Sequence, residues 1–288
     1  MGKVSKALDK AYHVNASPAG DQQKLEKMRG HSGPQTRAEK PEDKPVLKSR
    51  QPSSAAWDER LSQATTVTGP VAESFRTLRT RILHPDTGKI PRSLLITSAT
   101  PGEGKSFVCA NLGVVLAQGV DQYCLMVDCD LRKPALHRFF GLSLGRGLVN
   151  YLRDNEDLAS MIVPAGVETL SLLSAGPPPV NPAELLGSER LARLVDELEN
   201  RYDDRIILLD SPPLQAASET AILAQHVDGV ILVVRWGGSR REHVRKLVER
   251  IGRERIIGVV FNAYEENVLA AKAFGYYEYQ DNYSYREE

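Results

Sequence analysis

A loop with the composition of a phosphate-binding site occupies residues 98–106, where the sequence reads SATPGEGKS. Its two glycines let the main chain approach a ligand closely, and the start of the following helix directs N–H groups at phosphate oxygens. Lys105 can neutralise the terminal phosphates of a nucleoside triphosphate, and the Ser106 hydroxyl can bind Mg²⁺. Ala99 stands where the strict pattern has Gly, but the strand before the loop and the helix after it are the context that this motif requires. The segment therefore predicts a nucleotide-binding loop.

Two other apolar segments end in carboxylates that could hold the metal ion. LMVDCDLRK contains Asp128 and Asp130, and IILLDSPP contains Asp210. Because Mg²⁺ keeps several waters and needs few protein carboxylates, we expect Asp128 and Asp210 to bind it together with Ser106. Asp130 has two possible roles: it accepts the proton of an attacking hydroxyl group, or it pairs with Arg132 or the adjacent lysine.

The elements that must position these residues alternate between short apolar runs and helical patterns. Near-continuous apolar runs indicate strands that are buried on both faces, at residues 93–98, 123–127, 170–174, 205–209, 229–234 and 256–261. Helical signals lie at residues 105–118 and 239–252, and Asn181 followed by Pro182 predicts a further helix start. The fold class is therefore α/β, a P-loop NTPase with a mostly parallel β-sheet and helices on both faces, which binds ligands at the carboxyl ends of its strands.

Composition divides the 288-residue chain into three parts. Residues 1–69 form an N-terminal arm and linker, with a short helix at 4–12 and a remainder whose polar composition predicts disorder. Residues 70–275 form the P-loop domain, and residues 276–288 form a tyrosine-rich tail that we also expect to be disordered. The 37 basic and 37 acidic residues balance, so no global field attracts nucleic acid.

The remaining bulk features predict a cytoplasmic protein. The three cysteines are odd in number and show no metal-ligand spacing, which is typical of a reducing compartment. The sequence has neither an apolar run long enough to span a membrane nor a charged-then-apolar leader.

Two weaker signals follow the last two predicted strands. Trp236, the two glycines after it, and Asn262 are placed where they could contact the adenine and ribose of a nucleotide. Ordinary turn roles fit these residues equally well.

The three acidic and phosphate-loop motifs resemble the Walker A, Walker A′ and Walker B elements of the bacterial tyrosine kinases, or BY-kinases, which control polysaccharide polymerisation and export. The resemblance runs from about Gly69 to the end of the chain, and none of the eukaryotic protein-kinase signatures is present. It implies ATP and Mg²⁺ as cofactors and a catalytic set of Lys105, Asp128, Asp130 and Arg132. The implied ATP-binding set is Thr100, Gly102, Glu103, Gly104, Lys105, Ser106, Phe107 and Asn262.

Two further features resemble this family rather than the related partitioning and cell-division-site ATPases. Glu73, Arg76 and Arg79 match an E-x-x-R-x-x-R pattern, and the resemblance implies that their helix joins subunits into a ring; an ordinary solvated helix face is the alternative. Five of the ten tyrosines lie in the acidic tail and are the expected autophosphorylation sites, modified in trans between subunits: Tyr276, Tyr277, Tyr279, Tyr283 and Tyr285.

The resemblance also implies a partner and a place in the cell. The chain lacks the transmembrane helices that some family members carry, so a separate transmembrane polysaccharide co-polymerase would activate it and recruit it to the inner face of the plasma membrane. Two other functions stay open: a partitioning-type ATPase switch without kinase activity, and a regulatory scaffold whose kinase activity has decayed.

Overall fold

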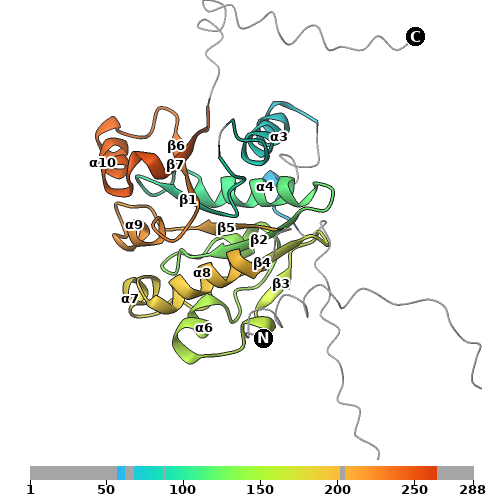
Figure 1. Cartoon of the computed structure of the whole chain (residues 1–288), viewed down its shortest axis with the longest axis vertical. Coiled ribbons are helices and arrows are strands. Elements are labelled where there is room, and N and C mark those ends of the chain that lie inside the picture. Colours follow the sequence, from blue (N-terminus) through green and yellow to red (C-terminus); the bar gives the residue numbers. More distant parts are fainter. Residues whose placement is uncertain (1–56, 62–67, 87, 202–204, 265–288) are drawn as a thin grey trace, which may run out of the picture.

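The computed structural model describes residues 57–61, 68–86, 88–201 and 205–264 (Figure 1). Its centre is one seven-stranded sheet with the order β3-β4-β2-β5-β1-β6-β7. All neighbouring strands are parallel except β3, which pairs antiparallel with β4 at one edge. The strands are β1 Ser93–Ser98, β2 Tyr123–Asp128, β3 Ile162–Pro164, β4 Leu170–Leu173, β5 Arg205–Asp210, β6 Gly229–Arg235 and β7 Ile256–Asn262.

Helices connect most successive strands and cover the sheet on both sides. They are α3 Pro70–Leu83, α4 Lys105–Ala117, α5 Leu136–Phe139, α6 Leu148–Asp154, α7 Pro182–Leu186, α8 Glu189–Arg201, α9 Glu219–Leu223 and α10 Arg241–Ile251, with 3₁₀ turns at Leu158–Ser160 and Arg253–Arg255. In the described part of the chain, no helix combines the length and the apolar composition that crossing a bilayer requires.

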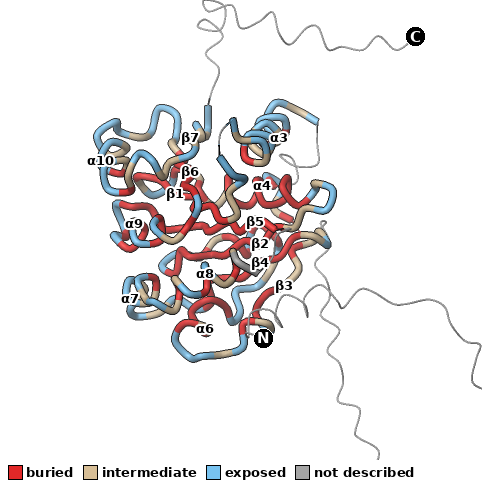
Figure 2. The backbone as a smooth tube through the Cα atoms, viewed as in Figure 1, coloured by how far each residue is buried: buried red, intermediate tan, exposed pale blue. Residues whose placement is uncertain are grey.

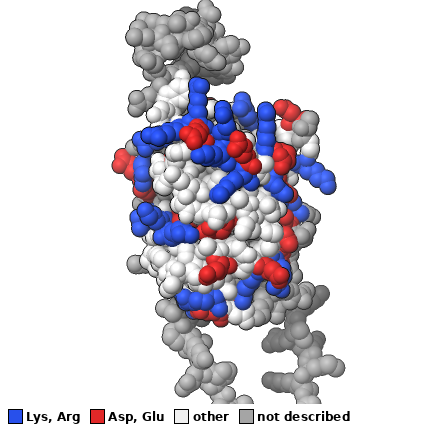
Figure 3. All heavy atoms as spheres, turned by 90° about the vertical axis from the view of Figure 1, so that its left-hand side faces the viewer, with Lys and Arg blue, Asp and Glu red and all other residues white. Residues whose placement is uncertain are grey.

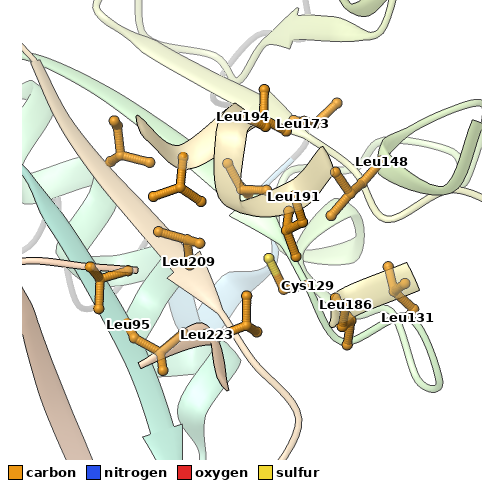
Figure 4. Close-up of a cluster of buried hydrophobic side chains, with 14 of the residues drawn as sticks. Leu95, Cys129, Leu131, Leu148, Leu173, Leu186, Leu191, Leu194, Leu209 and Leu223 are labelled. Carbon is orange, nitrogen blue, oxygen red and sulfur yellow. The ribbon is translucent and has the colours of Figure 1, made fainter. Parts of the chain in front are cut away.

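Two apolar cores lie on opposite faces of the sheet because side chains alternate along each strand. On β1, Leu94 and Ile96 point into the core beneath α3, α4 and α5, whereas Leu95 points into the core beneath α6, α8, α9 and α10. Figure 2 shows the central strands as deeply buried, whereas the edge strand β7 is intermediate or exposed along its length. Figure 4 shows the second core, where the Cys129 thiol lies among leucines. Burial raises the pKa of this thiol well above its usual value, which makes Cys129 a packing residue.

The predicted α/β fold class is confirmed, and the six predicted strands match observed strands to within one residue at either end. The sequence analysis missed β3, which has only three residues and ends in Pro164, so it gives no periodic signal. Pro182 does open helix α7, but the Asn181 side chain makes no capping hydrogen bond.

The expectation that residues 1–69 form an unpacked arm is wrong for the short described segment 57–61. Trp57 and Leu61 are buried in the core beneath α4 and α5, and the Trp57 ring packs edge-on against Phe140 at 5.8 Å. The main-chain N–H of Asp58 donates to the carbonyl of Phe139 at 2.9 Å. Two large apolar side chains in a polar stretch thus bind it to the domain, a feature that average composition conceals. The predicted helix at 4–12 lies outside the described residues.

Candidate active site

The phosphate loop runs from the end of β1 at Ser98 to the start of α4 at Lys105. Gly102 and Gly104 have left-handed backbone conformations, with φ of +79° and +91°. A Cβ atom on Gly104 would lie 1.9 Å from the Nδ2 atom of Asn262, so this position requires glycine for space as well as conformation. The two glycines therefore shape the turn that presents the N-terminus of α4.

A buried carboxylate braces the loop from inside. Glu103 Oε2 accepts a hydrogen bond from the main-chain N–H of Ala99 at 3.2 Å. Its Oε1 atom accepts hydrogen bonds from the hydroxyl groups of Thr100 and Ser239, both at 2.6 Å. The side chains of Glu103 and Thr100 are thus occupied within the loop, and any contact that they make with ATP would come from their main chain.

Two residues at the ends of β6 and β7 donate hydrogen bonds to main-chain carbonyls of the same loop. The Asn262 amide donates to the carbonyl of Glu103 at 2.9 Å, and Arg235 donates to the carbonyl of Gly102 at 3.5 Å. Asn262 therefore braces the loop, a role that the sequence analysis did not foresee. Ser239 was also missed, because no local pattern links it to a loop 136 residues earlier in the chain.

Asp128 and Asp210 lie side by side at the carboxyl ends of β2 and β5, where the strand register pairs them directly. Asp128 accepts hydrogen bonds from the main-chain N–H groups of Asp130, Ala135 and Leu136 at 3.1–3.2 Å. Both oxygens of Asp210 are buried, and among the described residues neither makes a hydrogen bond of normal geometry. Such a buried, unsatisfied carboxylate is costly unless a ligand completes the site.

Burial shifts the acidity of these carboxyl groups. It raises the pKa of Asp210 to about 7, against the opposing effects of the Lys105 charge and the Ser106 hydroxyl. It also raises the pKa of Asp128, and the neighbouring Asp210 adds to that shift. The two carboxyl groups therefore share a site in which both negative charges are costly and a cation would be stabilised.

The residues present fit a magnesium ion. The orphaned oxygens of Asp210 face the same site as Asp128 and the phosphate loop, and they are hard oxygen ligands of the kind that Mg²⁺ prefers. The described residues contain no group of three or more His, Cys, Asp or Glu side chains arranged to hold a metal. A magnesium ion keeps several waters and needs few protein carboxylates, so the pair Asp128 and Asp210 is sufficient for this chemistry.

Asp130 and Arg132 follow β2, but they do not pair with each other. Asp130 accepts the main-chain N–H of Lys133 at 3.1 Å, and burial raises its pKa although the Lys105 charge opposes the shift. Arg132 instead forms an ion pair with Glu219 of α9 at 2.9 Å. Glu219 is only 4% exposed at its side chain, so it fixes the loop after β2 against the element after β5. The sequence analysis did not identify Glu219.

The E-x-x-R-x-x-R residues on α3 have different surroundings. Glu73 and Arg76 form an exposed ion pair at 3.1 Å. Arg79 donates to the carbonyl of Val115 in the last turn of α4 at 3.1 Å, where a positive charge complements the helix C-terminus. Glu73 and Arg76 thus lie on the surface, whereas Arg79 also binds α3 to its own subunit. The role of all three in a ring stays a prediction.

Phe107 directs its side chain away from the nucleotide loop. Its ring packs against Phe75 of α3 at 6.0 Å and Phe139 of α5 at 6.5 Å. Only its main chain could contribute to phosphate binding. The five predicted phosphorylation sites, Tyr276, Tyr277, Tyr279, Tyr283 and Tyr285, lie outside the described residues.

Comparison with known proteins identifies the class and then the family. Residues 94–278 match the model of the CobQ/CobB/MinD/ParA nucleotide binding domain, so the chain is a P-loop protein of that class. It is 35% identical over 214 residues to the tyrosine-protein kinase YwqD of Bacillus subtilis (strain 168), covering 74% of this chain and 88% of YwqD. The chain belongs to the bacterial tyrosine kinase family, and the predicted enzyme class, a protein-tyrosine kinase, is confirmed.

Solved structures agree with this family assignment. The kinase domain of the Escherichia coli tyrosine kinase ETK matches with a TM-score of 0.64 and 30% identity, covering 72% of this chain and 82% of that structure. The chimerical protein CapA2B2 matches with a TM-score of 0.65 and 32% identity, covering 73% and 92%. Several further curated tyrosine kinases are much longer, and the chain spans less than a third of their length.

Proposed function

We propose that this chain is an autokinase that transfers the γ-phosphate of Mg-ATP to tyrosines of its own C-terminal tail, in trans between subunits. The observation that carries the proposal is the buried pair Asp128 and Asp210 beside the phosphate loop, with neither oxygen of Asp210 accepting a hydrogen bond of normal geometry among the described residues. A metal–phosphate ligand would satisfy these groups and remove their mutual repulsion.

Different residues of the phosphate loop would bind the nucleotide and stabilise its charge. Lys105 is more than nine-tenths buried, and its charge lowers the pKa of Asp210 and of Asp130. It would neutralise the transferred phosphate, and the N-terminus of α4 would donate N–H groups to the remaining oxygens. Ser106, Asp128 and Asp210 would hold Mg²⁺, which when bound supplies positive charge to the transferring phosphoryl group.

Asp130 would accept the proton of the attacking tyrosine hydroxyl. Its raised pKa makes it a better base than an ordinary carboxylate, and its hydrogen bond with the main chain of Lys133 orients it. Arg132 is held by Glu219, so the loop after β2 keeps a defined position relative to α9. Arg132 would then stabilise negative charge at the site of transfer.

The acceptors would be the five tail tyrosines, supported by their concentration in the last 13 residues. Five phosphates would add roughly −8 to −10 charge to each subunit. If Glu73, Arg76 and Arg79 join subunits into a ring, this repulsion would loosen the ring. Light scattering before and after phosphorylation tests the idea, and an unchanged molecular mass would contradict it.

The wider role proposed is the control of exopolysaccharide or capsule synthesis and export. The chain would act in the cytoplasm, at the inner face of the plasma membrane, and a separate transmembrane co-polymerase would activate it. Support comes from membership of the bacterial tyrosine kinase family. The alternative function is a partitioning-type ATPase switch, which needs the same nucleotide site but no tail.

One mixing experiment tests the kinase proposal and the trans mechanism together. The full chain is incubated with labelled Mg-ATP, with and without a candidate activator, and the modified residues are mapped. Lys105→Met should abolish labelling, whereas Lys89→Met, a change at an exposed lysine, should not. A Lys105→Met chain should become labelled at its tail when it is mixed with an active chain whose five tail tyrosines are Phe. Steady ATP hydrolysis with no label on tyrosine would favour the switch.

A further inference from the structure

An apolar groove lies between α10 and β7. In the sheet, β7 is on the opposite side of β1 from β2 and β5, the strands that end in Asp128 and Asp210. The volume of the groove is about 1040 Å³. Valines from β6, β7 and α10 form much of its lining, and Trp236 and Phe261 stand at the end where both strands finish. The same end carries Ser239, which donates to Glu103 of the phosphate loop. Through Ser239 and Arg235, which both hydrogen-bond to the phosphate loop, the groove adjoins the nucleotide site.

The apolar surface of the groove is exposed in the described structure. Strand β7 is at the edge of the sheet, and alternate residues Ile257, Val259 and Phe261 present large apolar side chains to the surface. Phe261 is 58% exposed and Trp236 is 51% exposed. A contiguous apolar patch with a polar rim is typical of a binding surface.

The rim of the groove is strongly basic. Residues 235–255 contain eight Lys or Arg and three Asp or Glu, although the whole chain is neutral. Four of these arginines line the groove: Arg235, Arg241, Arg245 and Arg253. Figure 3 shows basic side chains gathered over the upper part of this face, where α10 lies. The chemistry of the groove therefore suits a segment that is both aromatic and acidic.

The chain itself contains such a segment close by. Residues 276–288 hold five tyrosines, four acidic residues and one arginine. The last described residue is Tyr264, whose ring packs against the Trp236 ring of the groove lining at 4.9 Å. The intervening residues 265–275 can span at most about 40 Å, which is sufficient to fold back along α10.

We propose that the groove between α10 and β7 is a docking site for Tyr276–Glu288 of the same chain. Tyrosine rings would cover Trp236 and Phe261, and the carboxylates would pair with the arginines of the rim. A short tether gives an effective concentration in the millimolar range, so even weak docking would favour the chain's own tail over a second copy. The binding itself does not require that the tail be a kinase substrate, so its failure and the failure of the proposed function are separate results.

The two tryptophans of the chain make the proposal directly measurable. Trp57 is buried and its Nε1 atom has no hydrogen-bond partner among the described residues, so Trp57→Phe leaves Trp236 as a single reporter at modest cost. Acrylamide quenching of Trp236 is measured in the full chain and in a variant whose five tail tyrosines are Ser. Because tethered docking should be nearly complete, we expect a quenching constant at least about twofold lower in the full chain than in the variant.

Charge variants on α10 provide the matched comparison. Arg245→Glu, in the groove, should raise the quenching constant toward that of the five-serine variant, whereas Arg250→Glu, on the same helix outside the groove, should not. Circular dichroism confirms that each variant is folded. A synthetic peptide of residues 276–288, added to the five-serine variant, should restore the protection in a saturable way.

Several results would overturn the proposal. Equal quenching constants in the full chain and the five-serine variant would show that the tail does not cover Trp236. Protection that disappears on dilution would assign the occupant to a second copy. If a non-hydrolysable ATP analogue protects Trp236 in the five-serine variant as well as the tail does, the groove holds the nucleotide base instead.

Discussion

Replacing Asp210 with Asn should stabilise the unliganded protein at alkaline pH and remove its response to Mg-ATP. Burial raises the pKa of Asp210 from 3.8 to about 7, so holding this group ionised in the folded state is costly. A pKa difference of about three corresponds to about 4 kcal/mol of unfolding free energy. Asn keeps the volume and removes the charge but leaves a polar amide buried, so we expect a gain of about 2–4 kcal/mol at pH 8.

The sign of the effect follows from proton linkage. Below about pH 4, Asp210 is protonated in the folded and the unfolded chain, and its charge has no influence on stability. Between pH 4 and pH 7 the unfolded chain releases the proton but the folded chain retains it. The contribution of Asp210 to the free energy of unfolding therefore falls as pH rises through this window and is lost above about pH 7. Asp210→Asn removes this dependence, so the two proteins should diverge as pH increases.

The assay is thermal unfolding at pH 5, 6, 7 and 8 in the presence of a chelator. For a domain of this size 1 kcal/mol shifts Tm by about 2–4 °C, so the variant should gain at least about 4 °C at pH 8 and much less at pH 5. Addition of Mg-ATP should then raise the Tm of the wild type but not of Asp210→Asn. Asp86→Asn, at an exposed carboxylate, is the control. A variant that is less stable than the wild type at pH 8, or an unchanged difference across pH, would refute the reasoning.

Three further substitutions test the elements around the site. Gly104→Ala should weaken ATP binding at least about tenfold by calorimetry, because the added Cβ would meet the Asn262 side-chain amide. Gly88→Ala, at φ +90° in open space, should cost only about 1–2 kcal/mol of stability in a denaturant titration. Equal ATP affinities in these two variants would contradict the steric argument. Glu219→Gln should lower kcat about tenfold with little change in KM for ATP, whereas Glu242→Gln, at an exposed ion pair, should change neither. Ser239→Ala removes one hydrogen bond to the buried carboxylate of Glu103 and should weaken ATP binding about tenfold. An unchanged ATP affinity by calorimetry would show that this hydrogen bond does not shape the phosphate loop.

The sequence predicted those parts of the site that rest on local patterns. The phosphate loop has its own spacing, and two of the six apolar runs, at 123–127 and 205–209, are followed directly by an aspartate. Parallel pairing then brought Asp128 and Asp210 opposite each other, because β2 and β5 are neighbours in the sheet. Glu219 and Ser239 could not be predicted, because their partners lie 87 and 136 residues away and only the folded chain brings them together. Asn262 was singled out for its place after a strand, but its contact with the loop depends on the absence of a side chain at Gly104.

The placement of the groove implies that tail docking and nucleotide binding influence each other. Ser239 and Arg235 line the groove and also bind the phosphate loop, so a ligand that orders one side restricts the other. If this coupling is real, an ATP analogue and the tail change each other's affinity by the same factor. The analogue's Kd in the full chain and in the five-serine variant gives the factor from one direction. A tail peptide titrated into the five-serine variant, with and without the analogue, gives it from the other. Equal factors different from one would show that the nucleotide site senses the tail, whereas a factor of one would mean that the loop and the groove are independent.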